Sequence, residues 1–164
     1  MPEMLRIEPD KCTGCMQCEL ACSYVKTGQF QPAMSLIRVH IFDEHAAYTP
    51  YTCFQCAESW CVTACPVNAI ATDPDTGAKA IVEAACVGCS LCTIACPFGT
   101  VFLNPISHVA MKCDLCGGDP ACVRACPTDC LAYADADNSA LAGAWTGKLA
   151  KQVQAAHAEA YGDA

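Results

Sequence analysis

Cysteine spacing is the feature of this sequence with the clearest capacity for chemistry. The chain has 164 residues and 17 cysteines, and sixteen of these cysteines fall into four groups of four. The most regular group follows the pattern C-x2-C-x2-C-x3-C-P. Thiolate sulfur is a soft ligand for iron, zinc and copper, so each group has the composition of a metal site. This group consists of Cys86, Cys89, Cys92 and Cys96.

The other three groups repeat this pattern with small changes. All keep two residues between the first and second cysteine and three between the third and fourth, and insertions fall only between the second and third. A loop can lengthen there without disturbing the turn between the first two cysteines or the spacing between the last two. In chain order, motif 1 is Cys12, Cys15, Cys18 and Cys22, motif 2 is Cys53, Cys56, Cys61 and Cys65, motif 3 is the group above, and motif 4 is Cys113, Cys116, Cys122 and Cys126.

The spacing of motif 3 is the one that binds a 4Fe-4S cluster. Zinc sites also use C-x2-C pairs, but they rarely chain three cysteines and close with C-P. Disulfides require an oxidising compartment, and the first residues, Met-Pro-Glu-Met-Leu-Arg, contain no apolar secretion signal. We therefore expect four 4Fe-4S clusters and a cytoplasmic, reducing location.

Motifs for other chemistry are absent from the sequence. There is no C-x2-C-H haem site, no phosphate-binding loop and no dinucleotide fingerprint. Lewis-acid catalysis by a cluster normally leaves one iron without a cysteine, whereas every group here is complete. No acid-base pair or nucleophile lies in a recognisable motif. We expect electron transfer, with no catalytic residue in this chain and no enzymatic activity of its own.

Cys130 is the one cysteine outside the four groups. The segment Cys65-Pro-Val-Asn-Ala69 aligns with Cys126-Pro-Thr-Asp-Cys130, so Cys130 occupies the position of Ala69. A small buried residue beneath a cluster is the expectation, with a ligand or a redox switch as alternatives. Trp60, directly before Cys61, either shields a cluster from water or simply packs.

Charge and hydropathy narrow the choice of partners. The formal net charge is −8, and four oxidised clusters would bring it to roughly −16, which disfavours nucleic acid as a partner. Partners should offer neutral or basic faces. No apolar run reaches the roughly 18 to 20 residues that span a bilayer, so we expect no direct membrane insertion.

The elements between the cysteines are short. Alternating or apolar segments predict strands at 4–8 and 36–42, and hairpins at 69–71 with 80–82 and at 100–103 with 108–111. Together with short helices after the cysteine loops, this indicates an α+β fold. After Tyr133 the chain is rich in alanine, and an apolar stripe predicts one amphipathic helix from about 137 to 161. It packs on its own domain or serves as a docking or self-association element.

Residues 3–134 resemble the four-cluster ferredoxin-like iron-sulfur subunits that accompany molybdenum and tungsten oxidoreductases. The resemblance implies two interleaved bacterial dicluster units, motifs 1 and 4 forming one and motifs 2 and 3 an insertion at about 50–105, within a domain of residues 1–134 and before a C-terminal extension at 135–164. It also implies that paired motifs exchange their fourth cysteines. The implied ligands are Cys12, Cys15, Cys18 and Cys126 for cluster A; Cys113, Cys116, Cys122 and Cys22 for cluster B; Cys53, Cys56, Cys61 and Cys96 for cluster C; and Cys86, Cys89, Cys92 and Cys65 for cluster D.

A narrower resemblance rests on the segment from Cys12 to Tyr24 and on Gly28-Gln-Phe-Gln-Pro32. These residues are similar to the small subunits of tungsten-dependent aldehyde oxidoreductases. The implied partners are a catalytic tungsten or molybdenum subunit and a further electron-acceptor subunit. Alternatives are an iron-sulfur subunit of a formate dehydrogenase, hydrogenase or carbon monoxide dehydrogenase, and a polyferredoxin that stacks end to end into a conducting filament. A regulatory sensor is disfavoured because no DNA-binding segment is visible.

Overall fold

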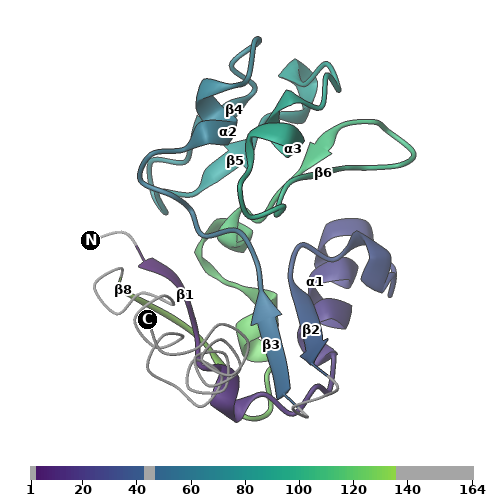
Figure 1. Ribbon diagram of the computed structural model, residues 1–164, viewed down its shortest axis with the longest axis vertical. Coiled ribbons are helices and arrows are strands. Elements are labelled where there is room, and N and C mark those ends of the chain that lie inside the picture. The colour runs from purple at the N-terminus through teal and green to yellow at the C-terminus, as the bar shows by residue number, and fades with distance from the viewer. Residues whose placement is uncertain (1–2, 43–46, 136–164) are drawn as a thin grey trace, which may run out of the picture.

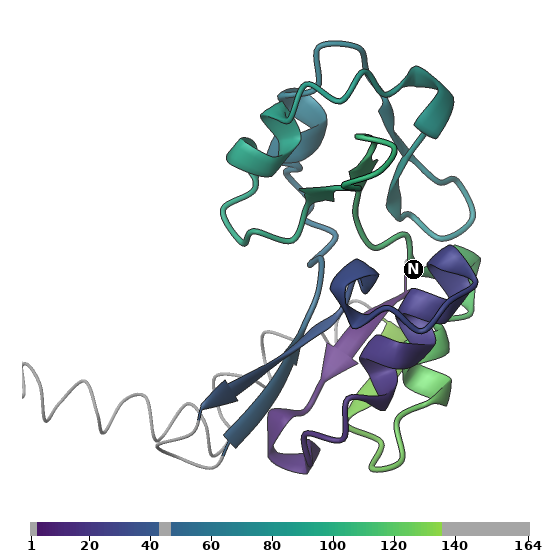
Figure 2. The same ribbon diagram turned by 90° about the vertical axis from the view of Figure 1, so that its right-hand side faces the viewer.

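The computed structural model describes residues 3–42 and 47–135, which form two lobes (Figure 1). The lower lobe in this view contains both ends of the described chain, and the upper lobe contains its middle. Seen from the side, two passes of the described chain join the lobes (Figure 2). One pass precedes motif 2, and the other precedes motif 4.

The lower lobe is closed by pairing of the first and last described strands. β1 (Glu3–Ile7) pairs antiparallel with β8 (Leu131–Asp135), and Ile7 lies opposite Leu131. Leu5, Ile7 and Leu131 are buried. This pairing, together with contact between α1 (Gln17–Thr27) and α4 (Ala121–Arg124), brings motifs 1 and 4 into one lobe. The prediction of a strand at 4–8 is confirmed, whereas β8 was not predicted.

A second hairpin of the lower lobe leads toward the upper lobe. β2 (Arg38–Phe42) pairs antiparallel with β3 (Ala47–Tyr51). The strand predicted at 36–42 begins two residues later, because Leu36 and Ile37 are drawn into the core. Ile41 is 50% exposed, so the apolar face expected along this strand does not extend to its end.

The upper lobe consists of two short helices and two short hairpins. The helices are α2 (Trp60–Thr63) and α3 (Leu91–Ala95), and they contact each other. β4 (Ile70–Thr72) pairs with β5 (Lys79–Ile81), and β6 (Phe102–Leu103) pairs with β7 (Ala110–Met111). Both predicted hairpins are confirmed. The helix predicted at 137–161 lies outside the described residues.

Four short 3-10 helices complete the described structure. η1 (Pro9–Lys11) and η4 (Glu83–Ala85) directly precede motifs 1 and 3, η2 (Pro32–Met34) precedes β2, and η5 (Leu115–Gly118) lies within motif 4.

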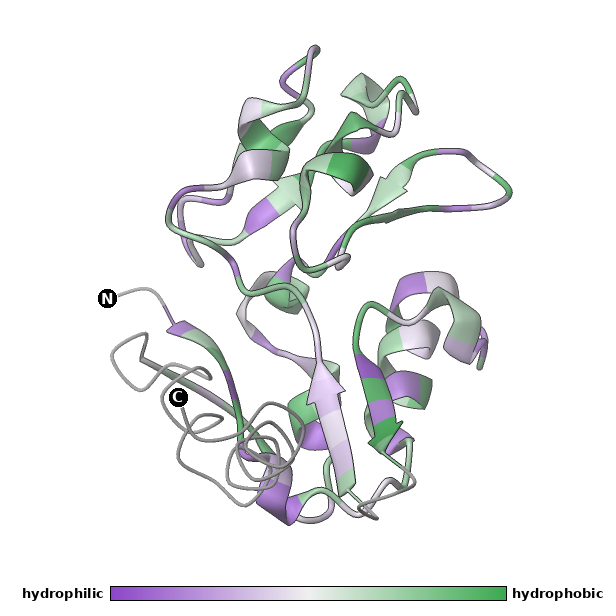
Figure 3. Ribbon diagram, in the orientation of Figure 1, coloured by the Kyte–Doolittle hydropathy of each residue, from purple (hydrophilic) through white to green (hydrophobic). Residues whose placement is uncertain are grey.

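Cysteines make up much of the buried interior in both lobes. The lower core combines Leu5, Ile37 and Leu131 with Cys18, Cys22, Cys113, Cys122 and Cys130. The upper core is smaller and contains Ile70, Val101, Ala110 and Cys92. Apolar residues also remain outside, as on α3, which is strongly green in Figure 3 and where Ile94 is 80% exposed.

Candidate metal centres

The first turn of all four cysteine motifs has the same backbone conformation. The residue just before the second cysteine has a positive φ in each: 69° at Gly14, 48° at Gln55, 67° at Gly88 and 57° at Leu115. This left-handed conformation turns the chain tightly between the first two cysteines. The repeat of spacing seen in the sequence is therefore also a repeat of backbone geometry.

Two of these positions require glycine for a second reason, which is lack of space. A Cβ at Gly14 would lie 2.5 Å from the ring of Tyr48, and a Cβ at Gly88 would lie 2.6 Å from the carbonyl oxygen of His108. Motifs 2 and 4 carry Gln55 and Leu115 at this position instead, both of them buried.

The fourth cysteine of motifs 2, 3 and 4 begins a second common turn. The proline after it is followed two residues later by a residue with positive φ: 51° at Asn68, 62° at Gly99 and 51° at Asp129. This turn directs polar hydrogens at sulfur, since Ala69 N–H donates to Cys65 Sγ at 3.2 Å. The Thr100 hydroxyl lies 3.3 Å from Cys96 Sγ.

Motif 1 differs because its fourth cysteine lies inside α1. Cys22 Sγ accepts from Leu36 N–H at 3.3 Å. Ser23, where the other motifs have proline, is fully buried; its hydroxyl donates to Leu20 O at 2.9 Å and accepts from Gln31 N–H at 3.2 Å. The helix can therefore continue to Thr27, and these bonds explain the missing proline.

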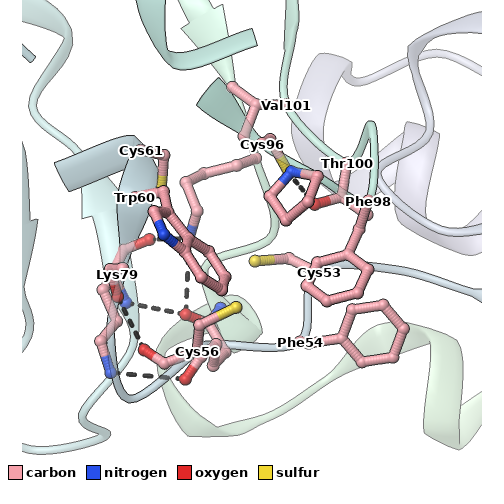
Figure 4. A pocket seen from close by; sticks show the side chains of 14 residues that line it. Cys53, Phe54, Cys56, Trp60, Cys61, Lys79, Cys96, Phe98, Thr100 and Val101 are labelled. Atoms are coloured by element: carbon pink, nitrogen blue, oxygen red, sulfur yellow. Dashed lines mark hydrogen bonds between the residues drawn. The ribbon is translucent and has the colours of Figure 1, made fainter. Parts of the chain in front are cut away.

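The upper lobe contains a hollow of about 350 Å³ bordered by sulfur atoms from two motifs (Figure 4). We call it the Cys53 hollow. Trp60 lines it and remains 51% exposed. Phe54 and Phe98 also line it, and the centroids of their rings lie 4.6 Å apart. Its cysteines are Cys53, Cys56, Cys61 and Cys96.

A second hollow of the upper lobe measures about 340 Å³. Apart from its cysteines, the residues that line it are largely apolar and include Ile70 and Ile81. We call it the Cys65 hollow. Here the fourth cysteine of motif 2 joins the first three of motif 3, which are Cys86, Cys89 and Cys92.

In the lower lobe, electrostatic influence shows which cysteines are neighbours. Burial raises the pKa of the Cys122 thiol, and the nearby Cys113, Cys22 and Cys116 raise it further. Burial likewise raises the pKa of Cys18 to about 12, with contributions from Cys12 and Cys15. Cys22 thus lies among the cysteines of motif 4, while the first three cysteines of motif 1 stay together.

Cys130 lies near both Cys12 and Cys126, so it places Cys126 beside the first three cysteines of motif 1. It is 2% exposed, and burial followed by the nearby Cys12 and Cys126 raises its pKa to about 12. Ala69, its counterpart in the internal alignment, is also 2% exposed. The predicted burial of Cys130 is confirmed, and its place beneath a cluster stays a prediction.

The surroundings of two of the fourth cysteines, Cys96 and Cys126, lower the pKa of the thiol. Burial opposes ionisation of Cys96, but the Thr100 hydroxyl and the N–H groups of residues 98–100 outweigh it and lower its pKa. Cys126 follows the same rule: the N–H groups of Thr128 and Leu131 outweigh burial and lower its pKa. A thiolate is the form that binds iron, so these turns prepare ligands.

The two hollows of the upper lobe fit a 4Fe-4S cluster in the type and number of donors. Each of the two hollows is bordered by four thiol sulfurs, the ligand set of that cluster. In the part of the chain that the structure describes, no group of three or more His, Cys, Asp or Glu side chains is placed to hold a single metal ion. The sulfurs surround a volume instead of converging on a point.

Residues 44–136, more than half of the chain, match the family described as the 4Fe-4S dicluster domain, and residues 5–24 match the 4Fe-4S binding domain. The chain belongs to the 4Fe-4S dicluster family. Within residues 3–42 and 47–135, no helix is long and apolar enough to cross a membrane.

Several named proteins are similar to this dicluster protein. The polyferredoxin-like subunit of the aliphatic sulfonate oxidoreductase of Pyrococcus furiosus is 42% identical over 73% of this chain and 69% of its own length. The thiosulfate reductase electron transfer subunit PhsB of Salmonella typhi is 33% identical over 84% of this chain and 78% of its own. The beta subunit of the NADH-dependent phenylglyoxylate dehydrogenase of Aromatoleum evansii is 37% identical over 79% of this chain, but only 29% of that longer protein is covered.

Sequence reasoning missed a polar group that the fold of this dicluster protein buries. Gln55 and Lys112 are 8% and 4% exposed, and both line the Cys53 hollow. Nothing in the local sequence marks a lysine for burial, since lysines are rarely buried unless paired. Its adjacency to Cys113 was the only available signal.

Proposed function

We propose that this protein is an electron-transfer subunit that carries four 4Fe-4S clusters and exchanges electrons with a separate catalytic oxidoreductase subunit. The observation that carries the proposal is that each hollow of the upper lobe is bordered by cysteines of two different motifs. The names of the similar subunits described above agree with this role. A bound 4Fe-4S cluster supplies reversible electron storage at a potential tuned by its surroundings.

The ligand assignment is part of the proposal. Cys96 borders the Cys53 hollow together with the first three cysteines of motif 2, and Cys65 borders the Cys65 hollow together with the first three of motif 3. Both observations support exchange of fourth cysteines in the upper lobe. The neighbours of Cys122 and Cys130 support the same exchange in the lower lobe. The four sets are those given above for clusters A, B, C and D.

The interleaved arrangement is proposed on similar grounds. Pairing of β1 with β8 joins the two ends of a domain spanning residues 1–134, and the segment at about 50–105 becomes an insertion. The helix predicted at 137–161 lies outside the described residues and stays a prediction. We assign it no catalytic residue.

Neighbouring cysteines support a linear order D–C–B–A for the four sites. Among the influences that raise the pKa of Cys92 after burial is Cys61, which links D to C. Cys53 acts in the same way on Cys113 and links C to B. Cys18 acts on Cys122 and links B to A.

The two ends of this order are the parts of the relay nearest to solvent. Cys15 of site A and Cys89 of site D are exposed, whereas the other fourteen assigned ligands are buried or half-buried. We infer that electrons enter at one of these ends and leave at the other. The exposed Ile94 and Leu91 on α3 would give the D end an apolar face for a partner protein.

For the partner, we retain the tungsten-dependent aldehyde oxidoreductase that the sequence resemblance implies. A cytoplasmic location is part of this proposal. None of the 17 cysteines is joined to another by a disulfide, which agrees with a reducing compartment.

Anoxic purification of the native complex, followed by metal analysis, tests the proposal. We expect about 16 iron atoms per chain and tungsten in a co-purifying subunit. Reduction of the clusters by that subunit's substrate would establish electron transfer. Iron near 8 per chain, or zinc in place of iron, would contradict the four-cluster assignment, while molybdenum or nickel would redirect the choice of partner.

A further inference from the structure

Lys112 is a buried lysine at the point where the chain returns from the upper lobe to motif 4. It is 4% exposed and lies between β7 and Cys113. Its Nζ donates to Cys113 O at 3.3 Å, to Gln55 Oε1 at 3.4 Å and to the backbone oxygen of Lys79. Three oxygen acceptors match the three N–H donors of a lysine ammonium group.

These contacts satisfy hydrogen bonds but supply no negative charge. The acceptors are two carbonyl oxygens and an amide oxygen, all neutral. Among the described residues, ion pairs with carboxylates are formed by Arg6, Lys11, Lys26 and Arg124, and none is formed by Lys112. A buried cation is costly unless an opposite charge lies near, so the compensating charge should come from elsewhere.

The Cys53 hollow, which Lys112 borders, can supply this negative charge from its cysteine thiolates and the cluster they would bind. Lys112 lines this hollow together with the four cysteines. Burial raises the pKa of the Cys61 thiol, and the charge of Lys112 is the largest influence opposing it. Cys56 is affected in the same direction, more weakly.

Gln55 holds the ammonium group in this position. Its Nε2 donates to Cys113 O at 2.7 Å, and its Oε1 accepts from Lys79 N–H at 2.9 Å as well as from Lys112. Gln55 itself lies between Cys53 and Cys56. One side chain therefore ties motif 2, β5 and motif 4 together around the charge.

We propose that Lys112 sets the reduction potential of the cluster held by Cys53, Cys56, Cys61 and Cys96, raising it above the value that the same ligands would give without the charge. The inference rests on the proposed assignment of these four cysteines to one cluster. Reduction adds one electron and makes the site one unit more negative, so a fixed positive charge stabilises the reduced form more than the oxidised form. The electron comes from the neighbouring site of the relay.

The chain offers a matched control for this charge. Lys11 also directly precedes the first cysteine of a motif, but its side chain is 48% exposed and pairs with Glu8 at 2.7 Å. Solvent and this carboxylate screen its charge. If a charge beside a cysteine loop were sufficient, Lys11 and Lys112 would each raise the reduction potential of a nearby cluster. If the charge must be buried and have no carboxylate partner, only Lys112 will raise it.

The test is a redox titration of the anoxically purified holo-protein, followed by electron paramagnetic resonance, for Lys112→Met, Lys112→Arg and Lys11→Met. In Lys112→Met we expect the midpoint of one cluster to fall by a tenfold or larger change in its equilibrium constant for reduction, which is about 59 mV for one electron. The affected signal should be the one that Cys56→Ser alters. Lys112→Arg and Lys11→Met should leave all four midpoints near those of the native protein.

Iron content separates failure of this inference from failure of the proposed function. Full iron content with all midpoints unchanged in Lys112→Met would overturn the role of Lys112 and leave the relay intact. Low iron in the native protein would instead remove the relay. If Lys112→Met does not assemble, Gln55→Glu gives Lys112 a carboxylate partner without removing it, and the same midpoint should fall; an unchanged midpoint there would also overturn the inference.

Discussion

At the scale of single residues, each cysteine loop requires one residue in the left-handed conformation whose side chain fits among the neighbouring atoms. Gly88 shows both parts of this demand, with φ at 67° and the carbonyl oxygen of His108 2.6 Å from where a Cβ would lie. Gly28, the C-cap of α1, has φ at 73° but has nothing within 4 Å of that position. The two glycines therefore separate conformational strain from crowding.

We expect Gly88→Ala to lose iron and Gly28→Ala to retain it. A left-handed alanine costs about 1–2 kcal/mol at either site, and the contact with the backbone of residue 108 adds to this only at Gly88. Gly88→Ala should hold about four iron atoms fewer per chain, measured by iron analysis after anoxic purification. Equal iron content in the two variants would show that crowding at Gly88 has no effect.

At the scale of elements, the lower lobe depends on contacts between the beginning and the end of the chain. One of these is the ion pair of Lys26 on α1 with Asp114 in the motif 4 loop, at 2.6 Å and with side chains 18% and 36% exposed. Burial works against both charges, but the pair raises the pKa of Lys26 and lowers that of Asp114. Asp114 also accepts from Cys116 N–H at 3.0 Å, which shapes the loop.

A double-mutant cycle with Lys26→Met and Asp114→Asn should give a coupling free energy of about 1 kcal/mol. The value is modest because the carboxylate remains partly exposed to solvent. Denaturant-induced loss of cluster absorbance in the holo-protein would provide the free energies. Simple additivity of the two single substitutions would mean that the pair does not join α1 to motif 4.

Truncation tests the pairing of β1 with β8. A chain ending after Asp135 keeps the strand, and we expect it to retain all four clusters. A chain ending after Cys130 leaves β1 unpaired and exposes Leu5 and Ile7, so the two lower clusters should be lost, with about eight iron atoms remaining per chain. Full iron content in the shorter chain would show that this sheet is dispensable.

The hairpins and the cysteine loops could be predicted because their signals are local. Asp73-Pro-Asp-Thr-Gly77 makes a turn from its own side chains, as Asp73 Oδ1 accepts from the N–H groups of Asp75 and Thr76. β3 and β8 could not be predicted in this way. β3 contains Pro50, and β8 follows a cysteine loop and pairs with a strand at the other end of the chain.

At the scale of the whole molecule, two lobes each combine two cysteine motifs, and two passes of the chain join them (Figure 1). Sequence spacing singled out sixteen candidate ligands but carried no information on which motifs meet, because the contacts between motifs 1 and 4 are nonlocal. The burial of Lys112 was hidden for the same reason, since its partners Gln55 and Lys79 are distant in sequence. The structure adds a proposed order of the four cluster sites and the positive charge of Lys112 beside the Cys53 hollow.

The central claim is that paired motifs exchange their fourth cysteines, and Cys96 tests it most directly. Electron paramagnetic resonance spectra of the reduced holo-protein should be compared for Cys96→Ser, Cys53→Ser and Cys86→Ser. We predict that Cys96→Ser alters the same cluster signal as Cys53→Ser, although Cys96 follows Cys86 in its own motif. Alteration of the Cys86→Ser signal instead would contradict the exchange and the linear relay built on it.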